Sequence, residues 1–254
     1  MPRHVDAWMD GVALSTLGSI LIQQVHEDAP TLEITEGDRP GRYGTLLLTR
    51  KRQALKVTIE TALRERFDLA LRSRLLEALA VWAQGSILEL SNHPERQLHV
   101  KCTGEPTLGT VRDYTENIRM EFTAHAVPYW EDKVSSGIAL SGSSKSGTLL
   151  IPGTVPAPVC MTVKPTGGAL TSFTVTVAGQ QIALTGLNVP QNGILTFSRD
   201  KRDDMTIAYN SVSQLSKRSA ASADDLMAAP GNAAVSFTAN TASTVTFSVR
   251  GRWA

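Results

Sequence analysis

Apolar and polar side chains alternate along several segments of the first half of the chain. Residues 55–60 place leucine, valine and isoleucine at every second position, with lysine, threonine and glutamate between them. Residues 117–126 repeat this pattern in NIRMEFTAHA, and residues 31–35 show it briefly in TLEIT. A period of two is that of a strand with one buried face. The pattern therefore predicts antiparallel strands in the first half.

One segment of the first half has the helical period instead. Within residues 69–84, leucines recur every four positions from Leu71 to Leu79, so they share one face of a helix. Asp68 is a favourable N-cap residue, and Gly85 is a favourable C-terminal stop. We expect a single helix over residues 69–84 that lays its leucine stripe across a sheet.

The second half, residues 148–254, contains no comparable helix. Residues 209–231 form a longer polar stretch, which we expect to be a surface excursion between strands. Elsewhere, short alternating segments rich in valine, threonine, isoleucine and phenylalanine are separated by proline, glycine and asparagine. This punctuation is typical of the turns of a β-sandwich. The segments are VCMTVKP, SFTVTVAG, QQIALTGL, GILTFSR, DMTIAYN, AAVSFTA and STVTFSVRG.

Composition also separates the two halves. Residues 1–130 carry 15 Lys and Arg against 17 Asp and Glu, a net charge of −2, whereas residues 131–254 carry 10 against 7, a net charge of +3. Small residues without helical periodicity cluster over 133–147, which is typical of a linker. We predict a mainly β protein. Its N-terminal domain, 1–132, is a β-sandwich or barrel-like sheet with one helix, and a linker at 133–147 leads to a C-terminal β-sandwich at 148–254.

The overall charge is nearly balanced, with 25 Lys and Arg against 24 Asp and Glu. Such a balance offers no bulk attraction to nucleic acid or to an anionic membrane. No apolar run approaches the roughly 20 residues of a membrane helix, and the N-terminus lacks the apolar core of a signal peptide. We therefore expect that the protein does not insert into a membrane and that it assembles in a cytoplasm. Cys102 and Cys160 lie far apart and do not resemble a disulfide framework, so we expect two free thiols.

The motifs that would indicate catalysis are incomplete. Residues 142–147, GSSKSG, have the glycine spacing of a phosphate-binding loop, but Thr148 stands where the loop needs lysine. His93, His99 and Cys102 are close enough in sequence to suggest a metal site. An offset of three on a strand, however, directs His99 and Cys102 to opposite faces. We expect no catalytic residue, no cofactor and no metal, so the chain is not expected to be an enzyme.

Two clusters are candidates for an assembly interface. Arg50, Lys51 and Arg52 form a basic run between two strand-like segments, in an expected hairpin or protruding loop. The run could contact phosphate or an acidic protein patch, and a solvated loop tip is the alternative. Tyr129 and Trp130 close the first domain, and flat aromatic side chains at domain edges commonly pack between domains or subunits.

Five short motifs occur in a recognisable order. A W-x-x-G motif at residues 8–11 comes first, and W-A-Q-G at 82–85 ends the helix. P-Y-W-E at 128–131 follows an alternating strand directly and is the most specific of the five. The second half adds IAYNSVSQLSK at 207–217 and a terminal VRGRW. In this order the chain resembles the distal tail protein (Dit) family of long-tailed bacteriophages and related prophages.

The resemblance implies a structural role at the tip of a virion tail. Members of the family form a homo-hexameric ring, sometimes two stacked rings, at the end of the tail tube. One face docks to the tail tube protein and the other to the tail hub or receptor-binding proteins. DNA passes through the central channel without specific binding, and the second domain is a galectin-like β-sandwich. The charge of −2 in the first half is compatible with such a channel.

A two-domain carbohydrate-binding protein, with its site on the C-terminal β-sandwich, is the alternative. A sugar platform commonly needs exposed aromatic side chains. Four of the six aromatic residues of the second half are expected in the core; the six are Phe173, Phe197, Tyr209, Phe237, Phe247 and Trp253. The mass in solution separates the two hypotheses, because only the tail protein is expected to form a ring of six.

Overall fold

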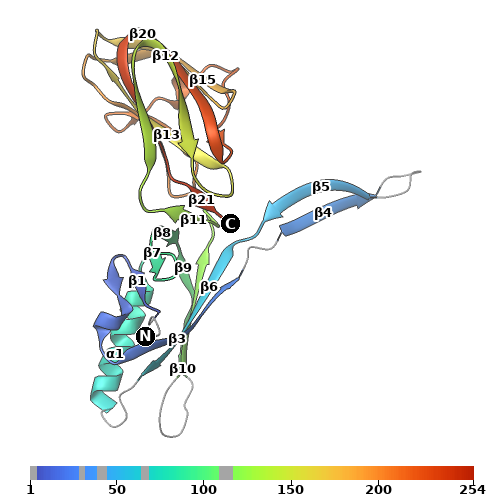
Figure 1. Cartoon of the computed structure of the whole chain (residues 1–254), viewed down its shortest axis with the longest axis vertical. Coiled ribbons are helices and arrows are strands. Elements are labelled where there is room, and N and C mark those ends of the chain that lie inside the picture. Colours follow the sequence, from blue (N-terminus) through green and yellow to red (C-terminus); the bar gives the residue numbers. More distant parts are fainter. Residues whose placement is uncertain (1–4, 29–31, 39–44, 64–68, 109–116) are drawn as a thin grey trace. The chain divides into compact units, whose positions relative to one another are not determined.

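The computed structural model describes residues 5–28, 32–38, 45–63, 69–108 and 117–254 (Figure 1). The chain divides into two compact units, which we call unit 1, residues 1–130 with Ala254, and unit 2, residues 131–253. Strands dominate both units, and one α-helix occurs among the described residues. The predicted mainly β fold with a single helix is confirmed.

Unit 1 combines a four-stranded antiparallel sheet, a small sheet, a hairpin and a helix (Figure 1). The four-stranded sheet has the order β3-β6-β10-β9, and the small sheet joins β2, β1, β7 and β8. Among the described residues, β4 and β5 pair only with each other. The elements are β1 (Ala7–Met9), β2 (Val12–Ala13), the 3-10 helix η1 (Leu14–Leu17), β3 (Ile20–Asp28), β4 (Leu32–Asp38), β5 (Thr45–Arg52), β6 (Leu55–Leu63), α1 (Leu69–Ala83), β7 (Ile87–Leu90), β8 (Arg96–His99), β9 (Lys101–Leu108) and β10 (Asn117–Ala124).

Strand β10 lies inside the four-stranded sheet and shows the predicted alternation. Arg119 and Glu121 point to its more exposed face and form an ion pair at 3.0 Å. On the opposite face Phe122 meets the edge of the Trp82 ring of α1, with ring centroids 6.1 Å apart. The apolar face of the sheet is thus packed against the helix. The fully buried side chains of β10 are Ile118, Met120, Phe122 and Ala124.

Helix α1 buries the C-terminal part of its predicted leucine stripe. Leu75, Leu79 and Trp82 are buried, whereas Leu71 is 37% exposed. The prediction was wrong at Leu71, which lies in the first turn of the helix, where the covering of the stripe by the rest of unit 1 is incomplete. Asp68, the predicted N-cap, lies outside the described residues.

Leu75→Ala should lower the free energy of unfolding by about 2–5 kcal/mol, because truncation leaves a cavity under the helix. Val81→Ala is the matched control on the same helix, since Val81 is 71% exposed. The control should change stability by less than about 0.5 kcal/mol. Urea unfolding monitored by circular dichroism measures both, and equal effects would show that Leu75 is not a core residue.

Unit 2 begins within β11 (Trp130–Asp132) and is described throughout. Its main sheet has the order β15-β14-β20-β13-β16-β17-β18, with β12 paired to β20 and β19 paired to β13. Strand β21 neighbours β11. The remaining elements are β12 (Ser136–Ile151), β13 (Ala157–Pro165), β14 (Leu170–Val177), β15 (Gln180–Val189), β16 (Leu195–Arg199), β17 (Met205–Tyr209), β18 (Val212–Ser213), the 3-10 helix η2 (Leu215–Lys217), β19 (Met227–Ala228), β20 (Gly231–Val249) and β21 (Arg252–Trp253).

Two long strands, β12 and β20, contribute to both layers of unit 2. Residues 235–239 of β20 pair with β14, whereas residues 243–249 pair with β13. Strand β12 follows β20 along both parts, with a register shift between Gly142 and Ser144. Both strands therefore pass from one layer to the other near these positions, which is how a single connected sheet folds into a β-sandwich.

Asn240 fastens the bend of β20, where the regular ladder is interrupted. Its Oδ1 accepts the backbone N–H groups of Thr171, at 2.8 Å, and Ser172, at 3.1 Å. Its Nδ2 donates to the carbonyl of Ala169 at 3.1 Å. The side chain thus supplies hydrogen-bond partners to backbone groups at the start of β14 that β20 does not pair.

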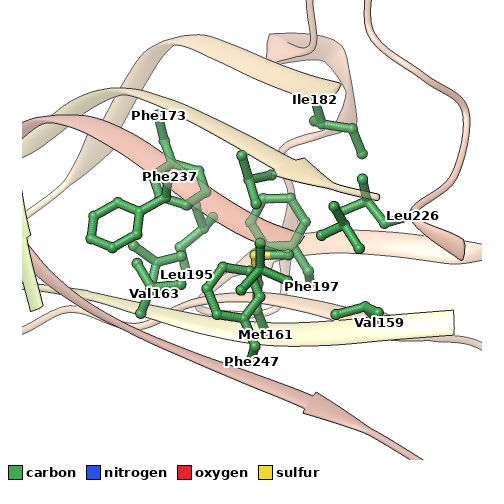
Figure 2. Close-up of a cluster of buried hydrophobic side chains, with 14 of the residues drawn as sticks. Val159, Met161, Val163, Phe173, Ile182, Leu195, Phe197, Leu226, Phe237 and Phe247 are labelled. Atoms are coloured by element: carbon green, nitrogen blue, oxygen red, sulfur yellow. The ribbon is translucent and has the colours of Figure 1, made fainter. Parts of the chain in front are cut away.

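The core of unit 2 lies between the two layers (Figure 2). Phe173 is in ring contact with Phe197 and with Phe237, at centroid distances of 5.9 and 6.1 Å. These three residues and Phe247 are all buried, which confirms the prediction that four of the six aromatic residues of the second half lie in the core.

Residues 133–147, predicted to be a linker, belong largely to β12, which begins at Ser136. Ile138 and Leu140 pack against the core. A Cβ on Gly147 would lie 3.1 Å from Leu140 Cδ2 and 3.3 Å from Ile138 Cδ1, so glycine leaves room for both side chains. The linker prediction was wrong because main-chain pairing with β20, more than buried side chains, holds this serine-rich strand in place.

The polar stretch at residues 209–231 runs along the outer edge of β15. The N–H of Ser219 donates to the carbonyl of Ala183 at 2.9 Å, and the N–H of Ala223 donates to that of Gln181 at 2.7 Å. The stretch therefore covers an edge strand that would otherwise present unpaired backbone groups.

Candidate functional site

The two tryptophan motifs of unit 1 contact each other. Asp10 and Gly11, with φ angles of 50° and 81°, form the turn between β1 and β2, a conformation that Asp-Gly favours. The indole N–H of Trp82 donates to the carbonyl of Val12 at 2.8 Å. The Asp10 carboxylate accepts the N–H of Ser86 at 3.0 Å. Both motifs therefore fix the end of α1 on the β1–β2 hairpin.

The acidic end of the P-Y-W-E-D segment meets the terminal V-R-G-R-W segment. Arg252 Nε donates to Glu131 Oε1 at 3.0 Å, and its Nη2 donates to Asp203 Oδ1 at 2.6 Å. Trp253 Nε1 donates to Asp132 Oδ1 at 2.8 Å. We call these five residues the end clasp. All five lie in unit 2, and the Arg252 side chain is only 4% exposed.

The charge on Arg252 depends on its carboxylate partners. Burial alone would lower the pKa of Arg252, but hydrogen bonds and charges from Asp203 and Glu131 outweigh burial and raise that pKa. Removing one partner would leave a buried charge less compensated, which is costly. The clasp was not predicted, because its hydrogen bonds join residues 121 and 49 positions apart.

Trp130, one of the predicted interface residues, is packed inside unit 1. It is 5% exposed, and its ring centroid lies 5.0 Å from that of His93. His93 Nε2 lies 3.1 Å from Glu27 Oε2, and Asn92 Nδ2 donates to Glu27 Oε1 at 2.8 Å. This turn of the chain covers Trp130, and its role at an assembly interface stays a prediction. Tyr129 is half-buried and remains a candidate.

The basic run Arg50, Lys51 and Arg52 lies in strand β5 and not in a loop. In the register of the hairpin, Arg50 is opposite Ile34 and Lys51 is opposite Glu33. The side chains described in β4 are exposed, Ile34 by 53%. A loop was expected because three consecutive cations do not fit a strand that buries one face. In the described part of this hairpin, however, no further layer covers the strands, so neither face has to be apolar. Isolated two-stranded ribbons are marginally stable, so the hairpin is suited to binding a partner.

The four-stranded sheet of unit 1 ends in two strands that each have one neighbour among the described residues. Strand β3 pairs with β6, and β9 pairs with β10. Such strands present unpaired N–H and C=O groups to which a strand of another chain can be added. Because the two edges differ, copies of the sheet can join head to tail.

The cysteines, the histidines and the glycine-rich segment that the sequence suggested for chemistry do not form a common site in the described part of the chain. Cys102 and Cys160 are free, and burial raises the pKa of both thiols, so little thiolate forms at neutral pH. His99 is exposed on β8, and the described part of the chain holds no His, Cys, Asp and Glu cluster suited to a metal ion. Residues 142–147 lie within β12 rather than in a loop before a helix. Among the described residues, no helix has the length and apolar character needed to span a membrane.

The architecture matches a solved phage protein along the whole chain. The protein is SPP1 Dit (gp 19.1), described as a paradigm of the hub adsorption apparatus in phages that infect Gram-positive hosts. It superposes with a TM-score of 0.72 at 13% sequence identity, covering 98% of this chain and 99% of that chain. The chain has the Dit fold. The resemblance inferred from the sequence motifs is thereby confirmed at the level of the fold.

The Dit fold is found here with little sequence identity to other proteins. A chain of the phage P2 baseplate in its activated conformation with Ca has a TM-score of 0.49 at 11% identity, covering 99% of this chain and 98% of that chain. No family profile and no curated protein matches the sequence. What the chain shares with SPP1 Dit is therefore the arrangement of its strands more than its residues.

Proposed function

We propose that this chain is a structural protein of a phage tail tip. In this proposal six copies form a closed ring that joins the tail tube to the hub or adhesion device. The observation that carries the proposal is the superposition with SPP1 Dit over both units. A fold alone does not determine function. Features of each unit therefore have to support the role independently.

Unit 1 has the features that a ring wall requires. The open edges of β3 and β9 differ, so a head-to-tail contact can repeat from copy to copy until the ring closes. The β4–β5 hairpin offers a second contact, because among the described residues its two strands pair only with each other. Residues 1–130 carry a net charge of −2, which suits a channel through which DNA slides without being held.

Unit 2 is proposed to be the platform for hub or receptor-binding proteins. Its phenylalanines are buried in the core, and its remaining aromatic side chains, Tyr209 and Trp253, are half-buried. The Trp253 N–H is already bonded to Asp132. Sugar-binding surfaces commonly stack an exposed ring on the ligand, and unit 2 displays no such ring. The side chains thus favour a protein partner over a glycan.

The mass of the purified full chain tests this function. Mass photometry and negative-stain electron microscopy should show rings of about six copies, alone or after addition of tail tube and hub proteins. A chain that stays monomeric under all these conditions contradicts the proposal. Binding to a glycan array by such a monomer would instead support the carbohydrate-binding alternative.

The basic run provides a test of one contact. Replacing Arg50, Lys51 and Arg52 together with alanine should weaken ring assembly about tenfold or more while leaving the fold intact. Dilution series in mass photometry measure the assembly, and circular dichroism measures the fold. The matched control replaces three exposed lysines of unit 2 with alanine: Lys145, Lys164 and Lys201. Unchanged assembly of the basic-run variant, or equal weakening in the control, would show that the run is not an interface.

A further inference from the structure

The first and the last residues of unit 2 lie side by side. The chain enters it at Glu131 and leaves it at Trp253. Its first long strand, β12, pairs antiparallel with the last part of β20, starting with Ser136 opposite Val249. Before that pair, the N–H of Asp132 donates to the carbonyl of Gly251 at 3.0 Å. Tension between the two ends of unit 2 would therefore open this ladder one hydrogen bond at a time.

The end clasp lies where such opening would start. Arg252 joins the strand that leaves unit 2 to Glu131 on the strand that enters it, and Trp253 joins the same two strands through Asp132. Arg252 also reaches Asp203, which follows β16 and is on neither strand. Three side-chain hydrogen bonds thus lie at the end that would separate first.

The backbone of Arg252 forms hydrogen bonds to another segment of unit 2. Its carbonyl accepts the N–H groups of Thr154, at 2.8 Å, and Val155, at 3.3 Å. Gly153 has a φ of 113°, and a Cβ there would overlap the Arg252 carbonyl, so only glycine permits this approach. Strand β21 is consequently bonded to three separate segments of unit 2.

We propose that the end clasp is a mechanical lock, which must break before unit 2 can open under tension between its two ends. Arg252 is the centre of the lock because it contacts the entering strand, the loop after β16 and the residues after β12. Opening would expose the Arg252 guanidinium and break its hydrogen bonds to both Glu131 and Asp203 in the same step. This inference goes beyond the proposed function, because it concerns the resistance of unit 2 to any partner that pulls on it.

Another arginine of unit 2 offers a contrast. Arg218 binds Asp224 at 3.0 Å, but the Asp224 side chain is 97% exposed. Arg218 lies beside β15, at an isolated bridge to Leu184, and not on the entering or leaving strand. Arg218→Met therefore makes the same chemical change as Arg252→Met away from the clasp, and it serves as the control.

Hydrogen exchange of the full chain, followed residue by residue by NMR, tests the lock. In Arg252→Met the amides of Asp132 and Thr154 should exchange about tenfold faster or more, while amides in the middle of the β13–β20 ladder keep their rates. Arg218→Met should leave both amides unchanged. Acceleration spread evenly over unit 2, or no acceleration at Asp132 and Thr154, would overturn the proposal. Because monomers suffice, this result is independent of ring formation.

Optical tweezers that hold the full chain by its termini test the response to force. Unit 2 of Arg252→Met should open at a lower force than unit 2 of the unaltered chain, and the event from unit 1 should not move. Equal opening forces would refute a mechanical role. Should Arg252→Met fail to fold, Glu131→Gln and Asp203→Asn each remove one ionic partner and keep the arginine. Each should accelerate exchange at the same two amides by a smaller factor, and the absence of any acceleration would equally overturn the lock.

Discussion

Phe247→Ala should destabilise unit 2 by about 3–5 kcal/mol and leave unit 1 unchanged. Phe247 is fully buried on β20, opposite Met161 of β13 on one side and Ile138 of β12 on the other (Figure 2). Both neighbouring strands are fixed by their hydrogen bonds to β20, so they cannot move inward to fill the space that the ring leaves. The cost should therefore include most of a cavity term in addition to the lost burial.

Differential scanning calorimetry of the full chain measures this effect. The transition of unit 2 should shift to lower temperature, and that of unit 1 should stay in place. Thr246→Ala is the matched control, because Thr246 is the preceding residue on β20 and faces solvent. It should cost less than about 1 kcal/mol, the span of strand propensities. If both variants shifted the transition equally, Phe247 would not be a core anchor.

Trp82→Ala should destabilise unit 1 by about 3–5 kcal/mol. Its ring packs on Phe122 of β10, and its N–H satisfies the carbonyl of Val12, so alanine removes a core contact and a hydrogen bond together. The same substitution removes one of the two contacts that fix the end of α1 on the β1–β2 hairpin. The effect should thus be among the largest of any single substitution in unit 1.

Trp82→Phe separates the two contributions. Phenylalanine keeps an aromatic ring against Phe122 but removes the hydrogen bond to the Val12 carbonyl, which should cost about 0.5–1.5 kcal/mol because Val12 is exposed and water can take the place of the donor. Urea unfolding of the three proteins, compared at equal temperature, gives both differences. A phenylalanine variant as unstable as the alanine variant would mean that the hydrogen bond, and not the packing, dominates.

The strands and the helix could be predicted because their signals are local. In β10 each buried residue is followed by a more polar one, and the leucines of α1 recur at the helical period. Such patterns directly reflect which face of an element is buried. The four core phenylalanines of unit 2 were predictable for the same reason. Local periodicity thus sufficed for the helix, for the alternating strands and for most of both cores.

The features that were not predicted depend on contacts that are distant in sequence. Strand β12 has few apolar residues, and its pairing with β20 joins Ser136 to Val249. Trp130 is buried because the turn that carries His93 covers it. Arg252 finds Glu131 and Asp203 only after the whole of unit 2 has folded. No window of neighbouring residues contains this information, so composition suggested a linker where a paired strand lies.

The pairing of the first long strand of unit 2 with its last one also sets the timing of folding on the ribosome. Strand β12 has no partner until β20 has been synthesised, and β20 begins only at Gly231. Pairs that close so long a loop form slowly and at a cost in entropy. The strands of unit 1, in contrast, are complete by Ala124 and can fold during translation. Nascent chains would therefore carry a folded unit 1 while β12 waits for its partner strand, so the two units fold at different times during synthesis.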